Sequence, residues 1–201
     1  MNDCTVYTLS ACFDEVGCDK NQAMRFLGCS GNTNEAMESL YSECLETVKK
    51  VCTFKAVWRK SALSFCGDDT VEFDFGKITS SALCKNLEGC KYAYVFAATA
   101  GVGVDRLMLR YKSIDAAKTM VISSIGSSAV ECWCDTVNKK ITEGKNAKPR
   151  FSPGYGGVDL KHQKEILEFL DATRKIGITL TDSYFMTPVK SVTAFIGIKE
   201  E

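Results

Sequence analysis

The chain has 201 residues and carries 25 Lys and Arg against 25 Asp and Glu, so its formal net charge is zero. Nucleic-acid-binding proteins usually show a strong basic excess, and no nucleic-acid partner is therefore expected. A hydrophobic fraction of 45% and a charged fraction of 25% are typical of a globular domain. The longest apolar run, residues 92–104, is too short to span a bilayer, so no membrane partner is expected either.

Eleven cysteines and a single histidine, His162, limit the chemistry that the chain can perform. The first residues lack the basic start and apolar run of a signal peptide, which predicts a cytoplasmic protein with free thiols. One histidine excludes a two-histidine zinc or iron site within one chain, and no Cys-x-x-Cys pair occurs. The sequence therefore predicts no metal site, and a thiol-dependent or metal-binding protein stays open as the less favoured alternative.

Two helices are expected first along the chain. A short one is predicted over residues 20–27, ending at a glycine. The next begins with a capping box formed by Asn32 and Glu35. Apolar residues in 37–48 then recur at spacings of three and four, which places them on one helical face.

The middle of the chain alternates strands and short helices. Strands are predicted over residues 53–60 and 71–75. In the second strand apolar and acidic residues alternate, so one of its faces is expected to be exposed to solvent. Ser80 is expected to cap a helix that ends at Leu87. Residues 92–98 are nearly all apolar, which indicates a strand buried on both faces.

A long helix is predicted over residues 115–142, with the small residues Gly126-Ser127-Ser128 in its middle, where another group can approach closely. Two prolines and four glycines then make 143–158 a loop. Asp159 is expected to cap a helix that ends at Gly177, before strands over 178–181 and 189–198. Helices and strands are mixed rather than strictly alternating. This order favours an α+β fold, with a mixed or antiparallel twisted sheet and flanking helices.

The loop from Arg150 to Tyr155 is the most unusual stretch of the chain. An arginine can grip a carboxylate with two parallel hydrogen bonds, and glycines such as Gly154 let a ligand approach the backbone. Tyr155 offers a flat face to a purine or a cation. A solvated surface turn is the plain alternative for the same residues.

Three motifs follow one another between residues 150 and 197 and resemble the C-terminal activation domain of cobalamin-dependent methionine synthase. They are Arg150-x-x-x-Gly154-Tyr155, Leu180-Thr181-Asp182-Ser183 and Met186-x-Pro188-x-x-Ser191-Val192. The resemblance extends more weakly to the long helix before the loop, and it covers little of residues 1–90. We therefore expect an N-terminal α+β portion, 1–90, and an activation-domain-like portion, 91–201, within one compact unit.

The resemblance implies binding of S-adenosylmethionine, which donates a methyl group to cobalamin that has lost activity by oxidation. By position in the motif, Arg150 is expected on the ligand carboxylate, while Gly154 and Tyr155 line the nucleoside. Ser152 falls where the family uses a backbone contact. Glu131, on the long helix, is expected to face the ammonium or sulfonium. No catalytic residue and no metal ligand is assigned.

The resemblance also implies partners. The chain has no Asp-x-His-x-x-Gly corrinoid motif, so cobalamin is expected on a separate corrinoid-binding protein or truncated methionine synthase, with a flavodoxin-like reductant. The chain would then be one part of a methyltransferase system and not a complete enzyme. The family continues past the last strand, whereas this sequence stops at Glu201. A non-catalytic corrinoid-protein interaction module with a degraded ligand site is therefore the alternative.

Overall fold

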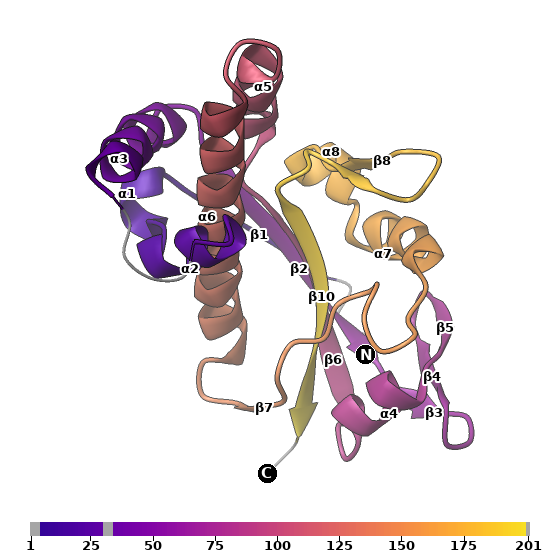
Figure 1. Cartoon of the computed structure of the whole chain (residues 1–201). Helices are drawn as coiled ribbons and strands as arrows, with labels where there is room; N and C mark the ends of the chain where they lie inside the picture. The colour runs from indigo at the N-terminus through magenta and orange to yellow at the C-terminus, as the bar shows by residue number, and fades with distance from the viewer. Residues whose placement is uncertain (1–4, 30–33, 200–201) are drawn as a thin grey trace.

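The computed structural model describes residues 5–29 and 34–199, which form a central antiparallel sheet with helices on both faces (Figure 1). In the described part of the chain, five strands make up this sheet in the order β1-β2-β6-β10-β7. They are β1 (Val6–Ala11), β2 (Phe54–Ala62), β6 (Tyr92–Thr99), β7 (Asn146–Ala147) and β10 (Ser191–Lys199). This arrangement confirms the α+β class and the sheet with flanking helices.

The side chains of the inner strands alternate between two hydrophobic cores. On β6, Phe96 faces the first core and Val95 the second, and both are fully buried. On β10, Ile196 and Phe195 divide in the same way. Because β6 and β10 are covered on both faces, their sequences are almost continuously apolar.

The first face of the sheet is covered by the longest helix together with four shorter ones. These are α1 (Phe13–Val16), α2 (Lys20–Phe26), α3 (Glu35–Lys49), α5 (Val102–Tyr111) and α6 (Ala116–Thr142). Asp115 caps α6 by accepting a hydrogen bond from the amide of Lys118 at 2.9 Å. Trp133 of α6 is fully buried, and its Nε1 donates to the carbonyl of Lys55 on β2 at 3.0 Å. This bond fixes the rotation of α6 against the sheet.

The second face is covered by short helices and a small three-stranded sheet. These elements are α4 (Ser81–Leu87), a 3-10 turn η1 (Leu160–His162), α7 (Gln163–Leu170), α8 (Ala172–Ile176), β3 (Ser64–Phe65), β4 (Thr70–Phe73) and β5 (Gly76–Thr79). A further hairpin pairs β8 (Thr179–Leu180) with β9 (Met186–Thr187). Figure 1 shows α6 and α1–α3 on one side of the sheet, with α4, α7 and α8 on the other.

Several sequence expectations need correction. The predicted capping box included Asn32, which lies outside the described residues; the structure begins α3 at Glu35, and Asn34 caps it by accepting from the amide of Met37. The single helix expected after Asp159 is broken at Asp171, whose φ of 53° is left-handed. Strand β1 and helix α5 were not predicted.

The two predicted portions, 1–90 and 91–201, share the central sheet. β2, in the first portion, pairs with β6, in the second, along their whole length. The division into 1–90 and 91–201 therefore remains a description of sequence resemblance. Among the described residues, no helix combines the length and the apolar character needed to cross a membrane.

Candidate functional site

The segment that carries the predicted site runs along the edge of the sheet beside β10. Lys148 donates its amide to the carbonyl of Gly197 at 2.8 Å, and Phe151 exchanges two backbone hydrogen bonds with Phe195, at 2.9 and 2.8 Å. The side chain of Phe151 packs with the second core. Arg150, one residue earlier, contacts α6 on the first face. The extended backbone thus points these two neighbouring side chains to opposite faces.

Arg150 is held by two carboxylates of α6. Its Nη2 donates to Glu131 Oε2 at 2.6 Å, and its Nη1 donates to Asp135 Oδ1 at 2.5 Å. The Arg150 side chain is 25% exposed and that of Glu131 is 33% exposed, so both are partly shielded from water. Glu131 and Asp135 lie four residues apart, which places them one turn apart on the same side of α6. We call these three residues the Arg150 cluster.

The charge of the Arg150 cluster is fixed by its surroundings. Partial burial works against the charged form of Arg150, but the carboxylates of Asp135 and Glu131 favour it, and the pKa of the guanidinium is raised. Cys134 lies in the core beside the cluster, and burial raises the pKa of its thiol well above the ordinary range. One guanidinium and two carboxylates leave the cluster with a net negative charge.

The glycine turn that follows Arg150 packs against the second face. Ser80, the cap of α4, donates its hydroxyl to the carbonyl of Gly156 at 2.7 Å. A Cβ on Gly156 would stand 2.7 Å from Ala82 Cβ, so only glycine fits this close approach to α4. Gly154 has a φ of 91° and donates its amide to Val158 within the turn. The amide of Gly154 is thus already used by the loop itself.

The predicted residues are therefore brought together only in part. Arg150 and Glu131 form an ion pair, whereas within the described residues no hydrogen bond or ring contact joins the Tyr155 side chain to them. Tyr155 is 73% exposed, and Ser152 is half-buried, with its carbonyl accepting from the amide of Tyr155. Asp135 was not predicted. Its signal was the spacing of four residues from Glu131 on the same helix.

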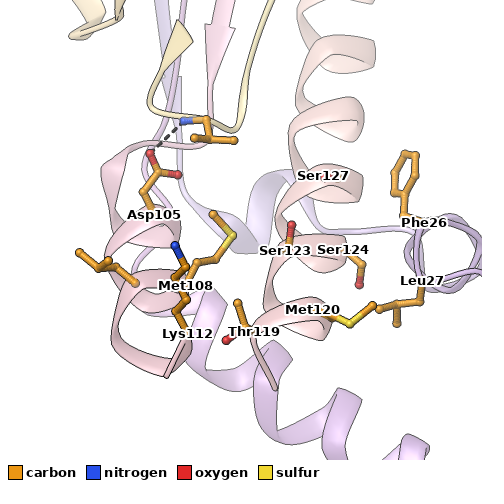
Figure 2. A pocket seen from close by; sticks show the side chains of 12 residues that line it. Phe26, Leu27, Asp105, Met108, Lys112, Thr119, Met120, Ser123, Ser124 and Ser127 are labelled. Carbon is orange, nitrogen blue, oxygen red and sulfur yellow. Dashed lines mark hydrogen bonds between the residues drawn. The ribbon is translucent and has the colours of Figure 1, made fainter. Parts of the chain in front are cut away.

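A cavity of about 750 Å³ lies further along the same helix, toward its N-terminal half. Its walls come from α2, α5, α6 and the loop before β10 (Figure 2). Ser127 of this cavity lies four residues before Glu131, so the cavity and the Arg150 cluster occupy successive turns on one side of α6. The sequence indicated only that small residues in the middle of α6 allow a close approach.

The long helix α6, the loop that carries Arg150 and strand β10 all lie within a segment that matches a known protein family. The model of the vitamin B12 dependent methionine synthase activation domain matches residues 82–201, which include α6, the loop and β10. The chain belongs to this activation domain family. The match includes all five predicted site residues but assigns no role to any of them. No curated protein sequence matches the chain.

Solved structures extend the likeness of this activation domain beyond the matched residues. The chain is similar to a crystal structure of the MetH reactivation domain bound to AdoHcy, with a TM-score of 0.73 and 16% sequence identity. The likeness covers 96% of this chain and 78% of that chain. The N-terminal half, in which the sequence showed little resemblance, therefore shares the fold. At this identity the likeness concerns the fold alone.

Proposed function

We propose that this activation domain binds S-adenosylmethionine at the Arg150 cluster. The observation that carries the proposal is the position of a guanidinium on two helix carboxylates, within the segment that matches the family. Arg150 has five N–H donors, and the two described bonds use two of them, so three remain for a ligand carboxylate. Glu131 uses one oxygen for Arg150, which leaves the other for an ammonium group.

Charge supports the choice of this cluster over the neighbouring cavity. S-adenosylmethionine carries a carboxylate, an ammonium and a sulfonium, and is a cation overall. The Arg150 cluster is net negative, whereas the cavity carries Lys112 in its wall and Lys190 behind two of its serines. Opposite charges attract at the first site and like charges repel at the second. Tyr155, exposed on the adjoining turn, offers a face for the purine.

The methyl acceptor in this proposal is a cobalamin held outside these 201 residues, on a corrinoid-binding protein or domain, with the electron supplied by a flavodoxin-like reductant. When bound, S-adenosylmethionine supplies an electrophilic methyl group on a sulfonium. The residues of this chain hold that group in place: Arg150 orients the carboxylate, and Glu131 fixes the amino group. Holding the sulfur at near-attack distance is a positional contribution to catalysis.

Calorimetric titration of the full chain with S-adenosylmethionine and with S-adenosylhomocysteine tests the proposal. Arg150→Ala is expected to weaken S-adenosylmethionine binding by about tenfold or more, because a charge-assisted hydrogen bond is lost. Glu131→Gln is expected to reduce the preference for the sulfonium ligand by about threefold. A unit charge about 6 Å away, at a dielectric constant near that of water, contributes about 0.7 kcal/mol.

Glu143→Gln serves as the matched control, because it makes the same charge change at the far end of α6, where the side chain is 76% exposed. Binding that is unaffected by Arg150→Ala would overturn the assignment of the site. Absence of binding at millimolar ligand would instead favour a non-catalytic module that only contacts a corrinoid protein.

A further inference from the structure

The cavity beside α6 has an apolar wall and one polar side. The apolar residues come from four separate segments and include side chains that are unusually open to solvent, such as Leu109 at 73% and Met120 at 60% exposure. The apolar lining residues are Phe26, Leu27, Met108, Leu109, Met120 and Val189. Flexible methionines and leucines adapt to ligands of varied outline. The volume lies in the range of small-molecule pockets.

The polar side is organised by a buried lysine. Lys190, just before β10, is 8% exposed, and its Nζ donates to the hydroxyls of Ser123 and Ser127 at 2.9 Å each. Both serines line the cavity, one turn apart on α6 (Figure 2). The lysine stem reaches them because it crosses Gly126, where a Cβ would stand 3.2 Å from its Cγ.

Two hydrogen-bond donors are therefore left on the cavity wall. Each serine oxygen accepts a hydrogen bond from the Lys190 ammonium. The hydrogen of each hydroxyl must therefore point away from the ammonium. Within residues 5–29 and 34–199, neither hydroxyl has a protein acceptor, and no carboxylate forms an ion pair with Lys190. The buried Lys190 ammonium is hydrogen-bonded only to neutral hydroxyl groups. Binding of an anion close to it is therefore electrostatically favourable.

Asp105 is the carboxylate of the cavity wall, but it does not serve as the anion beside Lys190. Asp105 accepts from the amide of Val189 through Oδ2 at 2.9 Å, while its Oδ1 is buried without a partner (Figure 2). It thus fastens the loop before β10 to α5. Burial lowers the pKa of Lys190, and Asp105 only partly opposes this effect. Lys112, exposed on the rim, adds a second positive charge to the wall.

We propose that this cavity binds an aliphatic monocarboxylic acid, with its carboxylate on the hydroxyls of Ser123 and Ser127 and its chain along the apolar wall. The ligand class follows from the two outward donors backed by an ammonium, together with a wall of Met and Leu side chains. This site is distinct from the Arg150 cluster, and its local charge is opposite. The inference stands independently of the proposed function.

Calorimetric titration of the full chain with octanoate, methyl octanoate and octyltrimethylammonium tests the inference. Octanoate is expected to bind at one saturable site and at least about tenfold more tightly than the uncharged ester or the cation. Lys190→Met keeps the aliphatic stem but removes the charge, and is expected to abolish this preference. Ser127→Ala, which leaves Lys190 in place, is expected to reduce it by about tenfold.

Lys164→Met is the matched control, because it removes the charge of an exposed lysine on α7, on the other face of the sheet. It is expected to leave octanoate binding unchanged. Equal affinities for octanoate and its methyl ester would overturn the inference, because they would show an apolar surface without an anion site. Absence of saturable binding at millimolar octanoate would overturn it as well. Circular dichroism of each variant separates lost binding from lost folding.

Discussion

Gly126→Ala tests how tightly α6 is packed against its neighbours. In a helix interior, alanine is favoured over glycine by about 1 kcal/mol from propensity alone. The new Cβ would, however, stand 2.8 Å from Val104 Cγ1 on α5, well inside the contact distance of about 3.5 to 4.0 Å between carbons. Val104 is fully buried, and buried side chains are closely packed. Overpacking of this kind costs about 2 kcal/mol, so we expect a net destabilisation of about 1 kcal/mol.

Urea denaturation followed by far-UV circular dichroism measures this balance. The matched experiment is a double-mutant cycle with Val104→Ala, which removes the contacting methyl group. In the Val104→Ala background, Gly126→Ala is expected to be less destabilising than in the unchanged chain, because the contact at 2.8 Å is gone and only the Lys190 stem, at 3.2 Å, still opposes the propensity gain. If Gly126→Ala stabilises the otherwise unchanged chain, the reasoning from close packing is wrong.

Two further predictions concern the start of α6 and the buried thiols. Asp115→Ala is expected to cost about 1 kcal/mol in urea denaturation, whereas Asp115→Asn keeps the cap acceptor and should change stability little; equal losses would contradict the capping role. Burial raises the pKa of Cys44 to about 11 and that of Cys52 to about 12. Unfolded thiols lose their protons near pH 8.5, so the unfolded state is favoured and stability falls as pH rises from about 9 to 11. Cys52→Ala should make this fall shallower, by up to about 1.4 kcal/mol per pH unit, and an unchanged slope would refute the linkage.

The sequence predicted those elements whose pattern is long or clearly capped. The helix predicted over 115–142 corresponds to α6 because apolar residues repeat over many turns and Asp115 caps it. The strand predicted over 92–98 corresponds to β6. It was predictable because a strand that is buried on both faces has a continuous run of apolar residues, without polar residues at alternate positions. Ser80 caps α4 as expected, since its hydroxyl accepts from the amide of Leu83 at 3.0 Å.

The missed elements have weak local signals. β1 is an edge strand whose side chains are mostly half-buried or exposed, so its sequence shows no clear alternation. α5 buries only Val104 and Leu107, and it starts beside two glycines that indicated a loop. Gly103 is needed there because a Cβ would stand 2.2 Å from the carbonyl oxygen of Val51. That contact comes from a distant part of the chain, and a local pattern cannot predict it.

The candidate site was predictable as a set of residue types but not as a geometry. The family motif identified Arg150 and Glu131, yet their ion pair depends on the position of the edge segment relative to α6. The cavity was less predictable still, because Phe26 and Leu27 on one side of its wall and Val189 on the other are far in sequence from α5 and α6. Lys190 gave no signal, since a single lysine before a strand is usually solvated.

Phe151 and Phe195 exchange two backbone hydrogen bonds, so the edge segment is expected to open together with β10 when the structure unfolds locally. Residues 148–151 share their hydrogen bonds with β10, so the backbone of Arg150 can move away from α6 only when the edge of the sheet itself opens. The glycine turn beyond it is anchored separately, through Ser80 on α4. A protease cut after Tyr155 would therefore separate the aromatic ring from the anchor at Gly156 and still leave the backbone of Arg150 paired with β10.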